Sequence, residues 1–133
     1  MKKKYVFISF IISLLLISCD NEHFEGQGAN MFEKDIYEFD SNAHTGTVKT
    51  RNAVVFWSNG VAEKINGEWI PVDNSLIEEK SVQGEWYSID WSTGDITYSI
   101  NENQTSKIRA VNITFCTGGG FDNFVIEQQG KHD

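Results

Sequence analysis

The stretch EWYSIDWSTGDITYSINENQTSKIRAVNITFCTGGGFDNFVIEQQG, residues 85–130, carries the clearest pattern in the chain. Apolar side chains alternate with polar or small ones over residues 111–116, and the alternation resumes over residues 124–127 after a glycine-rich break at 117–120. Residues 96–100 (ITYSI) have the same period of two. Such alternation is typical of half-buried strands. We therefore predict a three-stranded antiparallel unit here, around which the rest of the chain packs.

Upstream of this unit, short apolar and β-branched runs predict further strands. They cover residues 36–39, 46–51, 53–57, 61–65 and 68–70, and Pro71 ends or edges the last of them. Two Asn-Gly pairs, in Ser58-Asn59-Gly60 and in Asn66-Gly67, predict tight hairpin turns. Residues 73–84 read as a polar loop with one more strand around Leu76-Ile77.

No segment sustains a helical period, so the fold class that we predict is all-β. Short strands separated by Gly, Asn, Asp and Ser turns favour a single-domain, immunoglobulin-like β-sandwich. The chain has two cysteines, Cys19 and Cys116. With Cys19 acylated, as argued next, Cys116 has no partner, and we predict a sandwich with no disulfide.

The N-terminus predicts export. Lys2, Lys3 and Lys4 precede an apolar run over residues 5–17, which has the length of a signal peptide and is too short for an ordinary membrane span. The run ends in LISC at residues 16–19, which resembles the lipobox of bacterial lipoproteins. The resemblance implies a signal peptide at 1–18 and lipid on Cys19, so the membrane is a partner through that lipid. An ordinary secretory signal with a chance cysteine is the alternative.

Residues 19–31 then hold the lipidated cysteine and a polar, acidic tether, followed by one domain at 32–133. Acidic residues after the cysteine resemble surface-export tags, although a merely solvated linker explains them equally well. The expected location is therefore the bacterial envelope, at the outer membrane, facing either the periplasm or the cell exterior. Cleavage would remove 18 of 133 residues, three of them lysines and none acidic, so that the formal charge changes from −8 to −11. So acidic a domain is a poor partner for nucleic acid.

Residues 86–130 resemble the second half of a BACON-type domain (Bacteroidetes-associated carbohydrate-binding, often N-terminal). The matching features are a Trp strand, the Ser92–Gly94 turn, a strand ending near Asn103, Arg109 at the next strand start, and the closing Gln128-x-Gly130 pattern. The middle of the chain departs from the family. The resemblance implies an immunoglobulin-like sandwich with glycan or mucin binding, and it supplies no ligand residues. Asn103, Arg109, Gln128 and Gly130 are interpreted as fold markers, Arg109 bonding loop carbonyls and Gln128 a neighbouring backbone.

Nothing in the sequence predicts an enzyme, a cofactor or a metal site. The three histidines are scattered, and the acidic residues are spread through turns. Asp90, Asp95, Asp122 and Asn123 could meet at a loop end, but they form no calcium-loop motif.

Tryptophans are the candidates for ligand binding, because sugar rings stack on exposed aromatic faces. In residues 86–91 the alternation puts Tyr87, Ile89 and Trp91 on one face, so Trp86 is the candidate for exposure. Trp57 and Trp69, beside the Asn-Gly turns, come next, with Asp122 and Asn123 of the glycine-rich loop. Core packing is the alternative for every Trp. Two functions remain, a glycan- or protein-binding module and a structural or protein-interaction lipoprotein that binds no sugar.

Overall fold

The computed structural model describes residues 30–51, 57–117 and 120–132, without the side chains of Trp57, Asn59 and Thr117. The predicted signal peptide, Cys19 and nearly all of the predicted tether lie outside these residues, as does most of the strand expected at 53–57. No helix in the described part is long and apolar enough to cross a membrane.

The described residues form strands and one short 3-10 helix. The elements are β1 (Ile36–Phe39), β2 (His44–Val48), β3 (Trp57–Ile65), β4 (Glu68–Pro71), η2 (Asn74–Leu76), β5 (Ile77–Glu78), β6 (Ser81–Gln83), β7 (Tyr87–Asp90), β8 (Ile96–Ile100), β9 (Arg109–Thr117) and β10 (Gly120–Gln128).

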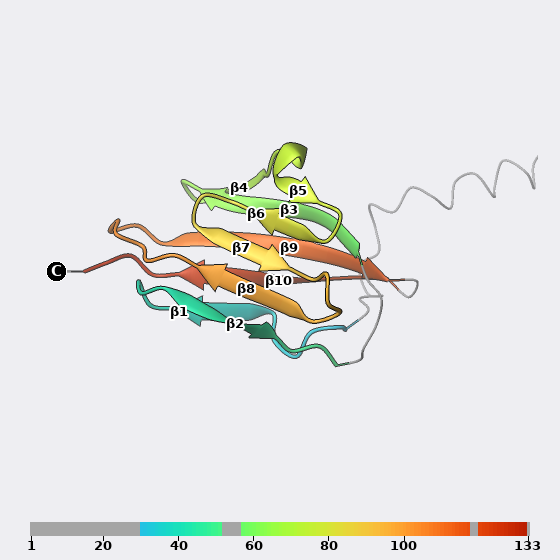
Figure 1. The fold of residues 1–133 in the computed structure, drawn as a ribbon. Coiled ribbons are helices and arrows are strands. Elements are labelled where there is room, and N and C mark those ends of the chain that lie inside the picture. The colour runs from blue at the N-terminus through green and yellow to red at the C-terminus, as the bar shows by residue number, and fades with distance from the viewer. Residues whose placement is uncertain (1–29, 52–56, 118–119, 133) are drawn as a thin grey trace, which may run out of the picture.

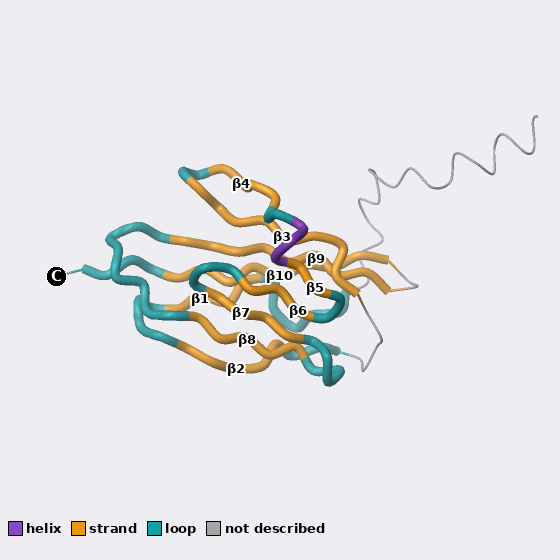
Figure 2. Tube along the Cα trace, turned by 45° about the horizontal axis from the view of Figure 1, so that its top comes forward, coloured by secondary structure: helices purple, strands orange, loops and turns teal. Residues whose placement is uncertain are grey.

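Two five-stranded sheets pack face to face, which makes the fold an immunoglobulin-like β-sandwich (Figures 1 and 2). The first sheet has the order β1-β10-β9-β3-β4, and the second has the order β2-β8-β7-β6-β5. Neighbouring strands are antiparallel except β1 and β10, which are parallel. The described residues hold no disulfide, and Cys116 is buried. The predicted fold class is therefore confirmed.

The core lies between the sheets and is built on aromatic contacts. The ring of Phe32 meets those of Phe115 and Phe124 edge-on, at centroid distances of 5.8 and 5.1 Å. The predicted alternations are confirmed by burial. In the C-terminal stretch the side chains on the buried faces of these alternations include Tyr87, Ile89, Trp91, Ile96, Ile100, Val111, Ile113, Phe115, Phe124 and Ile126.

Two expectations about the strands are wrong, and one is confirmed in part. β8 belongs to the second sheet, where it pairs with β2 and β7, so it forms no unit with β9 and β10. Residues 58–60 form no hairpin turn but lie inside β3, with a register shift against β9 between Ser58 and Gly60. The strand expected around Leu76-Ile77, within a polar loop at 73–84, is confirmed by β5, where Ile77 pairs with Val82, but the same segment also contains η2 and β6.

The described chain enters the sandwich where β10 begins. One carboxylate oxygen of Asp122 accepts the backbone N–H groups of Met31 and Phe32, at 2.7 and 3.1 Å. β1 then runs parallel to β10, with Ile36 beside Val125. The strand that opens the described domain therefore points in the same direction as the strand that closes it.

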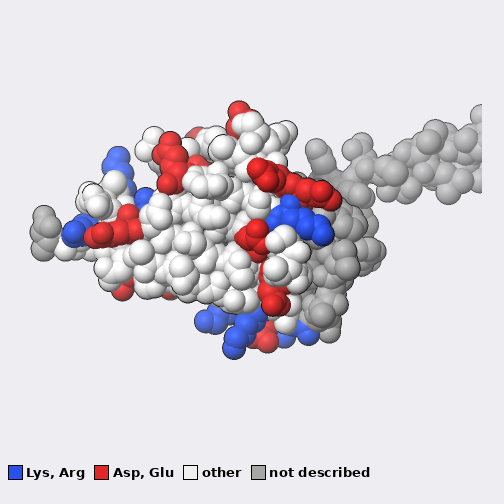
Figure 3. Space-filling model, viewed as in Figure 1, with Lys and Arg blue, Asp and Glu red and all other residues white. Residues whose placement is uncertain are grey.

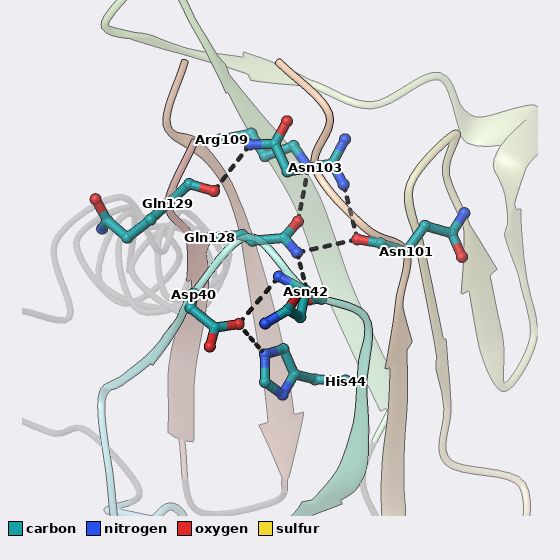
Figure 4. A network of polar contacts seen from close by, with 8 residues as sticks. All are labelled: Asp40, Asn42, His44, Asn101, Asn103, Arg109, Gln128 and Gln129. Atoms are coloured by element: carbon teal, nitrogen blue, oxygen red, sulfur yellow. Dashed lines mark hydrogen bonds and ion pairs between the residues drawn. The ribbon is translucent and has the colours of Figure 1, made fainter. Parts of the chain in front are cut away.

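Buried polar side chains join the two sheets at the opposite end (Figure 4). Gln128 is completely buried; its amide nitrogen donates to the carbonyls of Asn42 and Asn101, at 2.9 Å each, and its amide oxygen accepts from Arg109 Nε at 2.8 Å. Arg109 also donates to the Asn101 carbonyl at 2.9 Å. The predicted roles of Arg109 and Gln128, bonding loop carbonyls and a neighbouring backbone, match these contacts.

Asn103 closes the loop between β8 and β9 in the same region. It is completely buried, donates to the carbonyls of Lys107 and Gln129, and accepts the Thr105 N–H and hydroxyl. Gly130 lies against this loop, because an added Cβ would be 2.3 Å from the Ser106 carbonyl carbon. Loop and C-terminal segment are thus held in close backbone contact.

The outer face of the second sheet is rich in hydroxyl groups. Register places Thr45 and Thr47 of β2, Thr97 and Ser99 of β8, and Ser88 of β7 on this side. Figure 3 shows that charged side chains gather round the rim of this view and leave its centre uncharged.

Candidate functional site

Trp86 lies in the link between β6 and β7 and is partly buried against the core. Its ring meets Tyr87 edge-on at 4.9 Å. The Arg109 guanidinium lies over the ring, 4.6 Å from its centroid. Burial lowers the pKa of Arg109. One face of this indole is therefore covered by a cation, which leaves less aromatic surface for a sugar than the sequence suggested.

Trp69 lies on β4, the edge strand of the first sheet, and is 42% exposed. The two-residue turn at Asn66-Gly67 has positive φ at both positions, 51° and 83°, as a type I′ turn requires. That predicted turn is confirmed. It sets Lys64 directly opposite Trp69, with the Lys64 ammonium over the ring, 5.7 Å from the indole centroid. A cation therefore lies over this indole as well, but at a greater distance than Arg109 from Trp86.

The other nominated residues are placed differently. The side chain of Trp57 lies outside the described part of the structure. Asp122 and Asn123 belong to β10 rather than to a loop. Both oxygens of Asp122 accept backbone N–H groups, from Met31 and Phe32 on one oxygen and Asn123 on the other. These bonds give Asp122 a structural role in fixing the start of the domain.

A depression of about 330 Å³ lies on the outer face of the first sheet, next to Lys64. A row of paired residues crosses the sheet here, from Glu127 on β10 through Ala110 on β9 and Lys64 on β3 to Trp69 on β4. Ala110 is the small member of this row and is buried between longer neighbours. The hollow itself lies where the β3–β4 turn, the loop before β9 and the end of β10 adjoin.

The lining of this depression combines charged, polar and apolar groups. It consists of Lys64, Asn66, Gly67, Lys107, Ile108 and Glu127. Ile108 is 57% exposed and offers an apolar surface. Trp69 does not line the hollow itself, but its ring stands directly beyond Lys64. Apolar surface, amide and carboxylate acceptors and two ammonium groups therefore meet within one concave area.

Neither ammonium of the depression is neutralised. Within the described residues the ion pairs are His44–Asp40 and Lys131–Glu102, so Lys64 and Lys107 have no carboxylate partner. Glu127 accepts a long hydrogen bond of 3.4 Å from the Gln129 amide. The hollow thus carries two positive charges and one negative charge on a chain whose net charge is −8.

Exposed aliphatic side chains occupy the other face of the same hairpin. Ile65 is 49% exposed, Ile70 43%, and Leu76 on η2 44%. Register places Ile65 and Ile70 on the side facing the second sheet, because Ile70 pairs with Glu63 and Glu63 with the core residue Val111. Figure 2 shows the β3–β4 hairpin projecting from the body of the sandwich, so the second sheet leaves these side chains uncovered.

In the described residues no cluster of three or more His, Cys, Asp and Glu side chains could hold a metal ion. Asp90, one of the acidic residues considered at first, instead accepts the N–H and hydroxyl of Ser92, at 2.9 and 2.7 Å. These hydrogen bonds lower the pKa of Asp90. Its carboxylate stabilises a turn.

The sequence pointed to Trp69 but missed Lys107, Ile108 and Glu127. These residues meet Lys64 only through the pairing of β3, β9 and β10, which no local motif reveals. One signal was available. A two-residue turn at Asn66-Gly67 fixes the pairing of Lys64 with Trp69, and so predicts a cation beside that indole.

Comparison with known proteins supports the fold alone. No protein-family model matches the chain, and neither does any curated protein. A protein from Bacteroides thetaiotaomicron, solved by NMR, is 20% identical, with a TM-score of 0.65 over 86% of this chain and 99% of that one. Titin domain M7 is 14% identical, with a TM-score of 0.41 over 73% of this chain and 86% of its own. A similarity as weak as that to the titin domain supports no argument about this chain.

Proposed function

We propose that this chain is a non-enzymatic binding module that takes a glycan at Trp69 and the adjoining depression. The observation that carries the proposal is the exposed indole next to a concave, hydrogen-bonding surface. A sugar ring stacks its C–H face on an aromatic ring and bonds its hydroxyls to neighbouring polar groups. Trp69 and Ile108 would supply the apolar contacts, and Asn66 and Glu127 the polar ones.

The same proposal includes the expectations drawn from the N-terminus and from the family resemblance. In it, the module resembles a BACON domain and is held at the bacterial envelope by lipid on Cys19. Trp86 and Trp57 remain secondary candidates for ligand contact.

The test is a glycan array probed with the full chain in detergent, comparing wild type with Trp69→Ala. Because Trp69 is exposed, its removal should leave the melting temperature within about 2 °C, as expected for surface changes. Binding should fall at least tenfold. Ile36→Ala is the matched control, since Ile36 is 53% exposed on β1, at the opposite edge of the same sheet. Glycan binding that survives Trp69→Ala unchanged would refute this site.

A second function, docking of a protein partner, is favoured by the aliphatic face of the hairpin. Ile65, Ile70 and Leu76 are apolar without aromatic rings, which suits a protein surface better than a sugar. Ile70→Asp should then abolish capture of a defined envelope protein in cross-linking experiments while leaving the array unchanged. Equal capture by wild type and Ile70→Asp would rule out this face.

A further inference from the structure

The charges around the depression suggest what kind of ligand it accepts. Lys64 comes from the end of β3 and Lys107 from the loop before β9, so the two ammonium groups belong to different segments of the lining. Neither has a carboxylate partner among the described residues. Unpaired cations at a concave site attract anions, and the attraction is strong only at short range in physiological salt.

We infer that the depression binds a negatively charged sugar, with the anionic group held between Lys64 and Lys107. This inference rests on the proposed function and names its ligand class. The shared chemistry is one negative charge on a pyranose ring, supplied by a carboxylate or a sulfate ester. The ring places its apolar face against Ile108 and Trp69, and its hydroxyls bond Asn66 and Glu127.

Glu127 restricts where the anion can lie. Glu127 on β10 pairs with Ala110 on β9, and Ala110 pairs in turn with Lys64 on β3. The carboxylate of Glu127 and the ammonium of Lys64 therefore flank the hollow from opposite sides of β9. An anionic group close to Glu127 would be repelled, whereas hydroxyl donors there are favoured. The site therefore orients its ligand, with charge toward the lysines and hydroxyls toward β10.

The experiment measures binding of three matched trisaccharides to the full chain in detergent. One ends in glucuronate, one in glucose 6-sulfate, and one in neutral glucose. We expect at least one anionic form to bind tenfold or more tightly than the neutral form, and that difference should shrink in high salt. Comparison of the carboxylate and sulfate arms identifies the anion.

Variants locate the charge effect. Lys64→Gln and Lys107→Gln should each weaken anionic binding about tenfold, which corresponds to roughly 1.4 kcal/mol, and weaken neutral binding much less. Lys80→Gln is the matched control, because this exposed lysine lies between β5 and β6, in the other sheet. It removes the same charge and should have no effect.

The outcomes separate this inference from the proposed function. If the neutral sugar binds as tightly as the anionic ones and Trp69→Ala abolishes binding, glycan binding stands and the anionic preference is overturned. Anionic binding that is equally reduced by Lys80→Gln would also overturn it, since the effect would then be general charge. If none of the sugars binds, here or on the array, both proposals fall.

Discussion

At the scale of single residues, Gln128 shows how a buried polar side chain stabilises the fold when all its hydrogen bonds are made. All its hydrogen-bonding atoms are used, by two loop carbonyls and by Arg109. A buried amide of this kind costs stability only when a partner is removed. The residue is thus a connector between the loop after β1, the loop after β8 and the end of β10.

We expect Gln128→Ala to lower the free energy of unfolding by about 3 kcal/mol, because it leaves buried acceptors unpaired and opens a cavity. Chemical denaturation with fluorescence detection measures the change. Gln83→Ala is the control, since Gln83 is exposed on β6 and its loss should cost under about 0.5 kcal/mol. Equal costs at the two positions would contradict the structural role of Gln128.

Tyr87 makes stability depend on alkaline pH. Its hydroxyl is buried and donates to Glu63 at 2.7 Å. Burial first, and the bond and charge of Glu63 second, raise the pKa of Tyr87 above its ordinary value of 10.0. Above pH 10 the unfolded chain loses this proton while the folded chain keeps it. The corresponding stability is complete below pH 10 and is lost as pH rises toward the folded pKa.

Tyr87→Phe should therefore have two effects. At pH 7 it is less stable by about 1 to 2 kcal/mol, because the Glu63 bond is lost. Above pH 10 its stability declines less steeply than that of the wild type, although Tyr37 and Tyr98, whose pKa values are also raised by burial, keep part of the slope. Denaturation midpoints between pH 8 and 11 give both slopes, and parallel curves would contradict the assignment.

At the scale of elements, the close contact between Gly130 and the loop before β9 has no room for a side chain. Gly130→Ala would place its Cβ 2.3 Å from the Ser106 carbonyl carbon and 2.8 Å from the Lys107 nitrogen. We expect a melting temperature lower by several degrees, because backbone must shift. Gly60→Ala meets nothing within 4 Å and should be nearly neutral. A neutral Gly130→Ala would show that the loop is adaptable.

The elements also show how far sequence patterns reach. The Asn66-Gly67 hairpin was predictable because two residues with positive φ determine the whole turn. The same dipeptide at Asn59-Gly60 led to a wrong prediction of a turn, because the pairing of β3 with its neighbour β9 overrides the local turn preference. Alternation identified β8 as a strand but could not say which sheet it joins, since both sheets bury one face.

The candidate site was predictable only in part, for a related reason. An exposed Trp next to a tight turn can be nominated from sequence, and Trp69 was. The depression is lined by residues from the end of β3 and its turn, from the loop before β9 and from β10, and sequence spacing does not show that these three segments meet. The covering of Trp86 by Arg109 is likewise a contact between distant segments.

At the scale of the whole molecule, the lipid proposal predicts a chemical difference between the two cysteines. Cys19→Ser should abolish incorporation of labelled palmitate and move the protein from the membrane pellet to the soluble fraction. Cys116→Ala is the control and should keep the label, because Cys116 is a buried residue of β9. Labelling that persists in Cys19→Ser would contradict lipid attachment at this residue.

β1 and β10 run parallel, so the sandwich has one end, its base, where the described chain enters, and an opposite end where β10 finishes. Met31 is held where β10 begins, whereas Glu127 and the Asn66-Gly67 turn lie toward its other end. At about 3.4 Å per residue, the five residues of β10 from Asp122, which holds Met31, to Glu127 separate these levels by roughly 17 Å. A chain tethered through its N-terminus would therefore stand on its base and raise Trp69 away from the bilayer. Lengthening the tether would then extend reach toward distant glycans while the intrinsic affinity stays the same.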